Sequence, residues 1–148
     1  QLNRYNWLLN RRKEIIELYD RMLLPLGIER LQHYGEDFAS TGHLYLTKIP
    51  GAGEAERNTI IAKMAEMGVA CNVHYKPLPM FTAYKKLGFD IKDYPNAFDM
   101  YKNEITLPLH TLLTDEDVEY VCICLKKAIN ETLGMEHAVS EAAVAKLG

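Results

Sequence analysis

A long helical pattern opens the chain and constrains its fold more than any other feature. From Leu2 to Leu23 the apolar side chains recur at spacings of three and four residues, which places them on one stripe of a helix. Pro25 and Gly27 follow this stripe and predict its end. A helix of about 24 residues spans roughly 36 Å, so it either links two domains or packs within one, and the periodicity favours neither.

The chain starts at Gln1 and enters this helical pattern without a capping residue. The ends of native domains are usually looser than this. We therefore expect the sequence to begin inside a longer protein.

The composition is that of a globular protein with one domain. The 148 residues are 48% hydrophobic and 25% charged, and a chain of this size buries roughly 68–70% of its unfolded surface. The formal net charge of -3 argues against binding nucleic acid through its phosphates, which needs a basic face. Since no apolar run approaches the roughly 18 residues of a membrane span, we expect no membrane partner.

Three cysteines, Cys71, Cys122 and Cys124, are odd in number and lack the spacing of metal ligands. Such cysteines are typical of small buried hydrophobes in a reducing compartment. We therefore expect a reduced, cytoplasmic protein without a metal site.

Alternating and helical patterns divide the rest of the chain. Strands are expected at 43–49, 69–75 and 104–109, and residues 28–42 predict a loop with a short extended piece. Helices are expected at 54–67, at 82–87, from an N-cap at Asp93 to about Lys102, and from an N-cap at Thr114 onwards. The sum predicts an α/β (α+β) fold, in which helices cover mainly one face of a small three-stranded sheet.

The stretch richest in chemistry is a His-Tyr pair at the end of the second expected strand. His74 and Tyr75 enter a rigid turn that contains Pro77 and Pro79. A histidine can hold or release a proton near neutral pH, and loops at strand ends often display functional groups. The alternative is a buried histidine bonded to backbone with the tyrosine packed beside it, and the residues alone favour this alternative.

Several segments resemble the DegT/DnrJ/StrS family of pyridoxal-phosphate-dependent sugar aminotransferases. The run from Gly68 to Pro79 is similar to the family stretch G-I-x-x-x-x-H-Y-x-P-L/V-H, and Tyr84 to Gly88 fits the Y-x-x-L-G that follows it. The segment from Thr106 to Val118 resembles the closing S-L-P-L-Y/H-P-x-L-T-D-E-D-V. Pro79 stands where many members carry a second histidine, so no role of that histidine is expected here.

The resemblance implies the C-terminal small domain of a fold-type I aminotransferase. Residues 1–27 would be a linking helix, 28–134 the small domain, and 135–148 a tail that forms at most a frayed helix. The Schiff-base lysine and most pyridoxal phosphate contacts would lie in a large domain outside this chain, so the chain alone would be inactive. Arg11 and Arg12 of the helix are expected to form structural ion pairs.

The implied reaction transfers an amino group from an amino acid, with glutamate as the expected donor, to a nucleotide-linked keto sugar. Its expected setting is cell-surface polysaccharide biosynthesis, and its expected assembly is a homodimer. The resemblance places His74 and Tyr75 near cofactor and sugar as positioning residues, with Pro77 shaping the turn. The alternative function is a free-standing α/β module that binds a small molecule or dimerises without catalysis.

Overall fold

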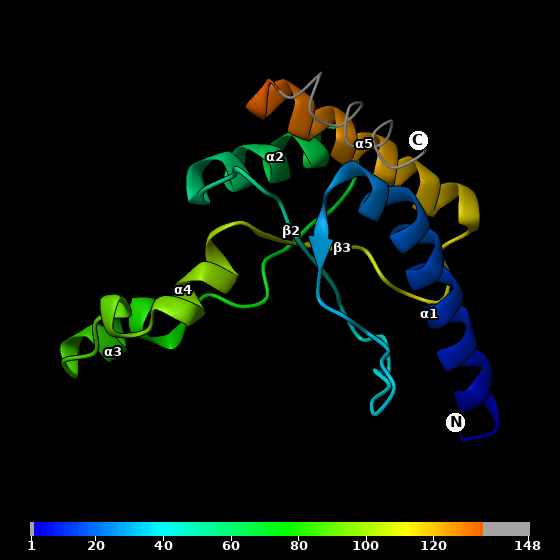
Figure 1. Ribbon diagram of the computed structural model, residues 1–148, viewed down its shortest axis with the longest axis horizontal. Helices are drawn as coiled ribbons and strands as arrows, with labels where there is room; N and C mark the ends of the chain where they lie inside the picture. Colours follow the sequence, from blue (N-terminus) through cyan, green and yellow to red (C-terminus); the bar gives the residue numbers. More distant parts are fainter. Residues whose placement is uncertain (1, 135–148) are drawn as a thin grey trace.

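The computed structural model describes residues 2–134, in which helices pack against a small sheet (Figure 1). The elements in chain order are α1 (Leu2–Leu23), the 3₁₀ turn η1 (Leu24–Leu26), β1 (Glu29–Arg30), β2 (Tyr45–Lys48), α2 (Glu54–Glu66), η2 (Leu78–Met80), α3 (Thr82–Lys86), η3 (Ile91–Asp93), α4 (Pro95–Lys102), β3 (Glu104–Leu107) and α5 (Asp115–Leu133). The expected long first helix is confirmed, and the η1 turn that follows it ends at Gly27, which has a positive φ of 76°.

The three strands form an antiparallel sheet in the order β1-β2-β3. Tyr45 pairs with Leu107, and Lys48 pairs with Glu104. Two of the expected strands, 43–49 and 104–109, are confirmed with shorter bounds. The third strand is β1, which lies within the region expected as a loop with a short extended piece.

The expected strand at 69–75 is wrong. Only Asn72 pairs there, in a single bridge with Thr106. Two residues later the His74 N–H donates to the Glu104 carboxylate at 2.9 Å instead of to a strand carbonyl. Pro77 and Pro79 then supply no N–H at all, so the segment leaves the sheet.

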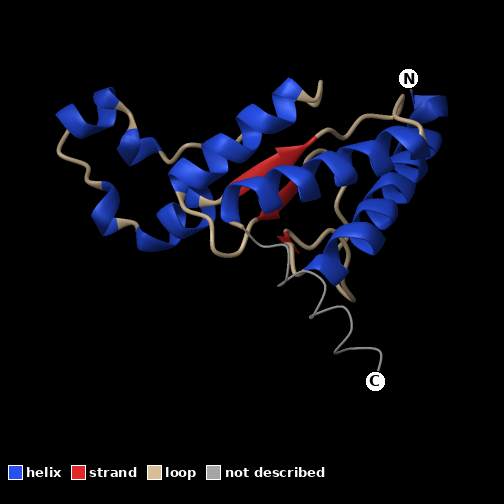
Figure 2. Cartoon of the chain, turned by 90° about the horizontal axis from the view of Figure 1, so that it is seen from above, coloured by secondary structure: helices blue, strands red, loops and turns tan. Residues whose placement is uncertain are grey.

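The core lies where α1, α2 and α5 meet the sheet (Figure 2). Helix α5 packs against both α1 and α2. Members from every layer are fully buried: Ile15, Ile16, Tyr19, Tyr45, Ile60, Met64, Ile105 and Leu125. The cysteines also behave as expected, because burial raises the pKa of the Cys71 and Cys122 thiols to about 12 and keeps them protonated.

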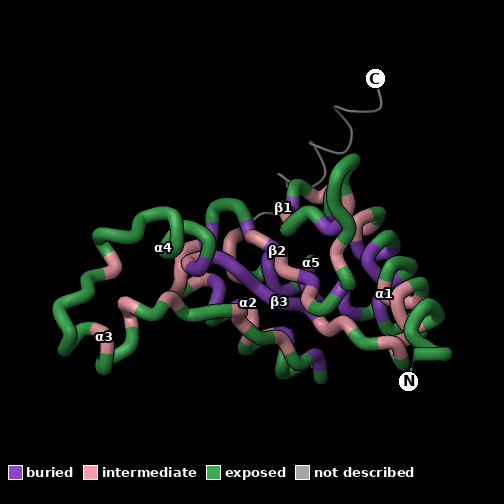
Figure 3. Tube along the Cα trace, turned by 90° about the horizontal axis from the view of Figure 1, so that it is seen from below, coloured by how far each residue is buried: buried purple, intermediate pink, exposed green. Residues whose placement is uncertain are grey.

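An arm made of η2, α3, η3 and α4 extends from this core, and most of its residues are exposed (Figure 3). The expected N-cap at Asp93 is wrong. Asp90 instead caps η3 by accepting the Lys92 N–H, and α4 begins at Pro95 after Tyr94. Two short helices therefore stand where one was expected: η3 starts after its cap Asp90, and α4 starts with Pro95 in its first turn.

None of the helices within residues 2–134 is long and apolar enough to cross a membrane. The expectation of a frayed tail at 135–148 lies outside the described residues. The domain boundaries at 27 and 134 stay predictions.

Candidate functional site

A hollow of about 340 Å³ lies between the sheet and the arm. Its lining includes both residues singled out from the sequence, His74 and Tyr75. Charged and aromatic residues of the sheet and of α4 also line it: Glu29, Arg30, Lys48, Tyr101 and Glu104. Pro77 is not part of this lining, and instead precedes η2, where its carbonyl accepts the Met80 N–H at 2.9 Å. The sequence therefore identified two residues of the wall and one of the turn behind it.

Strand β3 fixes the position of His74. The backbone N–H of His74 donates to Glu104 Oε2 at 2.9 Å, and its ring Nδ1 lies 2.9 Å from Thr106 Oγ1. The Tyr75 ring meets the imidazole edge-on, with 4.6 Å between ring centroids. Since Tyr75 is 71% exposed, its phenol is open to a ligand.

The Glu104 carboxylate is buried, with 3% of the residue exposed. Burial raises the pKa of Glu104, while hydrogen bonds from Thr106 and from the His74 N–H and the charge of Arg57 oppose that rise. Both carboxylate oxygens have partners, because Oε1 accepts the Thr106 hydroxyl and Oε2 accepts the His74 N–H. The group is thus a buried acceptor that ties the His74 segment to the sheet.

Arg57 of α2 braces the same wall from inside the core. It is 1% exposed, and its Nη1 donates to the Tyr101 carbonyl at 3.0 Å. The guanidinium carbon also lies 4.7 Å from the centre of the Tyr101 ring, a cation–π distance. The Tyr101 hydroxyl donates to Glu54 at 2.8 Å. These contacts hold α4 at the edge of the hollow.

Sequence reasoning missed Glu104, Thr106 and Arg57. The first two are two residues apart on a strand and so share a face, which is a usable signal once the strand is recognised. Arg57 carried no such signal, because in the sequence it looks like any other polar residue of an amphipathic helix.

The two cations at the hollow are already paired. Arg30 binds Asp20 through two hydrogen bonds of 2.7 and 2.6 Å. Lys48 Nζ lies 3.1 Å from Asp99 Oδ2. Lys48 is the one lysine among the described residues that line the hollow. Both cations of the described lining are therefore held by carboxylates of neighbouring elements.

Across the part of the chain that the structure describes, no cluster of three or more His, Cys, Asp or Glu side chains could hold a metal ion. The hollow has one buried carboxylate, Glu104, and one imidazole, His74. Glu104 accepts the backbone N–H of His74, and the His74 ring bonds to Thr106 of the same strand.

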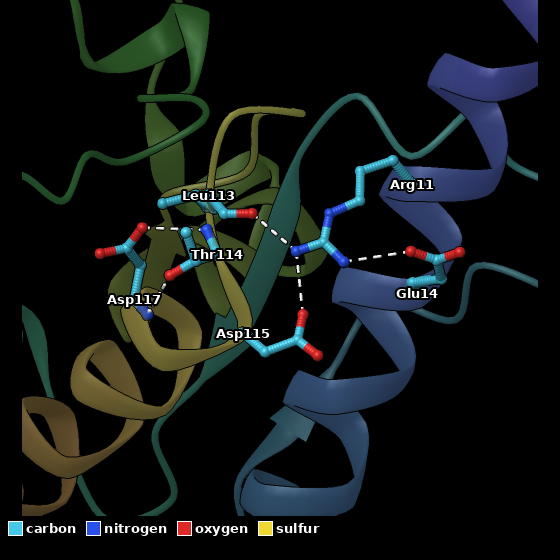
Figure 4. A network of polar contacts seen from close by, with 6 residues as sticks. All are labelled: Arg11, Glu14, Leu113, Thr114, Asp115 and Asp117. Carbon is cyan, nitrogen blue, oxygen red and sulfur yellow. Dashed lines mark hydrogen bonds and ion pairs between the residues drawn. The ribbon is translucent and has the colours of Figure 1, made fainter.

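Arg11 forms the structural ion pair that the sequence predicted (Figure 4). Its Nη2 donates to the Leu113 carbonyl at 2.6 Å and to Asp115 Oδ1 at 2.9 Å, and its Nη1 donates to Glu14 at 3.0 Å. Arg12 does not behave as expected. It has no ion pair within residues 2–134, and its Nη1 donates to the Thr41 carbonyl at 3.4 Å. Arg12 faces the loop before β2, where its partner is the Thr41 carbonyl and not a carboxylate.

Residues 1–126 match the DegT/DnrJ/EryC1/StrS aminotransferase family. The chain belongs to this family. Among solved structures, Spr1654 of Streptococcus pneumoniae, which is assigned as a sugar aminotransferase, is 49% identical in its PMP-form, with a TM-score of 0.88 over 91% of this chain and 34% of Spr1654. The expected fold class, that of fold-type I aminotransferases, is thereby confirmed.

Two curated relatives of the family have named roles. The spore coat polysaccharide biosynthesis protein SpsC of Bacillus subtilis is 31% identical over 126 residues, which cover 82% of this chain and 32% of SpsC. The UDP-4-amino-4,6-dideoxy-N-acetyl-beta-L-altrosamine transaminase of Campylobacter jejuni is 28% identical over 82% of this chain and 32% of the transaminase. The chain thus spans about a third of the length of the relatives it matches.

Proposed function

We propose that this chain is the small-domain part of a pyridoxal-phosphate-dependent aminotransferase. In this proposal the whole protein moves an amino group from an amino acid, with glutamate as the expected donor, to a nucleotide-linked keto sugar for polysaccharide biosynthesis. The family match over residues 1–126 carries it, together with the His74–Tyr75 wall of the hollow. The named roles of SpsC and of the C. jejuni transaminase support the substrate class.

The cofactor, when bound, supplies an electron sink for the amine transfer. This chain's contribution is geometric. The edge-on Tyr75 ring and the anchored His74 ring form a firm wall against which a sugar is oriented. Neither residue is assigned the transferred proton. The proposal further includes a homodimer in the cytoplasm, a linking helix at 1–27 and a small domain at 28–134.

A cofactor-trapping experiment tests this division of labour. The 148-residue chain is incubated with pyridoxal phosphate, treated with borohydride and mapped for labelled lysines. We expect no site-specific adduct, because Lys48 is held by Asp99. The longer protein that contains this chain is the positive control and should give one stoichiometric adduct. A single stoichiometric adduct on Lys48 would place the cofactor site in this chain and refute the division.

Substitutions in that longer protein test the wall. His74→Ala and Tyr75→Phe should each raise the KM for the sugar substrate about tenfold, the cost of roughly one hydrogen bond. His43→Ala is the matched control, because His43 is exposed in the loop before β2. If both wall variants match the wild type in KM and kcat, the positioning role is wrong. A role of this chain in dimer contacts, with no ligand role, would then be favoured.

A further inference from the structure

Three polar groups form a hydrogen-bonded chain beside the hollow. Thr106 Oγ1 lies between Glu104 Oε1 and His74 Nδ1, at 2.9 Å from the latter. A hydroxyl carries one hydrogen, so it donates in one direction and accepts from the other. An ionised carboxylate can only accept. The direction of the whole chain is therefore set by the Glu104 end.

Both oxygens of Glu104 are already acceptors. Oε2 accepts the His74 backbone N–H at 2.9 Å, and Oε1 accepts the Thr106 hydroxyl. With its hydrogen committed to Glu104, Thr106 must accept from His74, so the ring Nδ1 carries a proton. A neutral imidazole holds one proton, which leaves Nε2 with a lone pair.

We propose that Glu104, acting through Thr106, holds neutral His74 as the Nδ1-protonated tautomer, so that Nε2 accepts a hydrogen bond from a hydroxyl or ammonium group of the ligand. Glu104 and Thr106 are positioning residues, since they act through His74. At this point of the hollow the site selects a hydrogen-bond donor, and it disfavours a carboxylate or phosphate oxygen. A histidine fixed only by packing would select neither.

The two parts of this inference rest on different ground. The tautomer follows from the three contacts alone. The choice of ligand group deepens the proposed function and rests on it, because a sugar offers hydroxyl donors at this wall. A spectroscopic test on the chain itself therefore separates the tautomer from the activity of the whole protein.

The first test is NMR of the 148-residue chain labelled with ¹⁵N-histidine at about pH 8.5, where imidazoles are neutral. His74→Gln assigns the His74 signals by loss. We expect a protonated, pyrrole-like Nδ1 and a pyridine-like Nε2. Thr106→Ser keeps a hydroxyl in place and should preserve this pattern.

Glu104→Gln should reverse the tautomer. The amide has one oxygen, which the His74 N–H requires, so its NH2 group must point at Thr106. The Thr106 hydroxyl then turns and donates to Nδ1, and the ring proton moves to Nε2. If Glu104→Gln fails to fold by its backbone spectrum, Thr106→Val replaces it, and the wild-type preference for Nδ1–H should be lost.

A wild-type ring protonated on Nε2 overturns the proposal, and so does a Glu104→Gln or Thr106→Val variant that keeps the Nδ1–H pattern. The ligand part is decided by kinetics of the longer protein. Glu104→Gln should raise the KM for the sugar substrate about tenfold with kcat nearly unchanged, while Thr106→Ser should match the wild type. An unchanged KM beside a reversed tautomer refutes the ligand part alone, and absence of aminotransferase activity in the wild type refutes the proposed function instead.

Discussion

Arg11 ties the first helix to the start of the last one through a single side chain. Its side chain is 19% exposed, and the guanidinium donates to a backbone carbonyl as well as to Asp115. Arg11→Ala should lower the free energy of unfolding by about 1–2 kcal/mol, because it leaves the Leu113 carbonyl without a charged donor. Lys13→Ala is the control, since Lys13 lies 3.8 Å from Glu17 in an exposed pair and should change stability by less than about 0.5 kcal/mol. Urea unfolding measures both, and equal losses would contradict this account.

Glu104 gives the fold a pH dependence of its own. Because burial raises the pKa of Glu104 above its ordinary value of 4.5, the folded state binds the proton more tightly than the unfolded state. The stabilising effect of the protonated Glu104 carboxyl is complete below pH 4.5 and is lost as pH rises through the folded pKa.

Above pH 4.5 the urea midpoint of the wild type should fall as the pH rises through the folded-state pKa of Glu104. Glu104→Gln should remove this fall. Glu36→Gln, in an exposed loop, should leave the wild-type profile unchanged. Parallel profiles for the wild type and Glu104→Gln would show that Glu104 does not titrate differently on folding.

At the scale of elements, α5 begins with a reciprocal cap. The Thr114 hydroxyl accepts the Asp117 N–H at 3.1 Å, and the Asp117 carboxylate accepts the Thr114 N–H at 2.9 Å. Thr114→Ala should cost about 1 kcal/mol in urea unfolding, whereas Thr114→Ser should retain most of it.

These hydrogen bonds also lower the pKa of Asp117 below its ordinary value of 3.8. The stabilising effect of Asp117 is therefore present above pH 3.8 and is lost as pH falls through the folded pKa. Because Thr114→Ala keeps the backbone N–H that the Asp117 carboxylate accepts, Asp117→Asn tests this half of the cap. The difference in stability between wild type and Asp117→Asn should shrink in acid. A difference that is constant with pH would rule out the carboxylate half of the cap.

The elements that could be predicted from the sequence are those whose signals are local. Helix α5 has its apolar stripe and its Thr114 cap, and β2 and β3 have alternating β-formers. The strand expected at 69–75 has the same alternation, through Val69, Cys71 and Val73. It fails because pairing is a long-range property, and a carboxylate 30 residues away takes the His74 N–H. Local pattern cannot show that competition.

For the whole molecule, the candidate site shows the same division. His74 and Tyr75 could be found from the motif they share with the family, and they do line the hollow. Arg57 could not be found, and Glu104 and Thr106 offered only their shared strand face as a signal. The importance of all three arises when β3 and α2 are brought beside the turn. The motif therefore identified residues that line the hollow, and the fold identifies the residues that hold them in place.

Helix α1 and the segment that follows it share one core. Ile15, Ile16 and Tyr19 of α1 are fully buried and belong to the same cluster as the buried face of α5. The proposed linking helix is thus also part of the packing of the small domain. Within the described residues the helices and the sheet should accordingly unfold together, and a substitution inside this cluster should lower the stability of the whole unit.

Two isoleucines of α5 test that expectation with the same chemical change. Ile129 is 4% exposed in the core cluster, whereas Ile123 is 60% exposed on the outer face of the helix. Ile129→Ala should lower the free energy of unfolding by about 2–4 kcal/mol, through lost burial and the cavity left behind. Ile123→Ala should change it by less than about 0.5 kcal/mol.

Two probes of urea unfolding test whether α1 unfolds with the core. Far-ultraviolet circular dichroism follows all helices, and Trp7 fluorescence follows α1, which carries the tryptophan. The two transitions should coincide for both variants. An Ile129→Ala protein in which the Trp7 signal changes separately would show that α1 is a unit apart from the core.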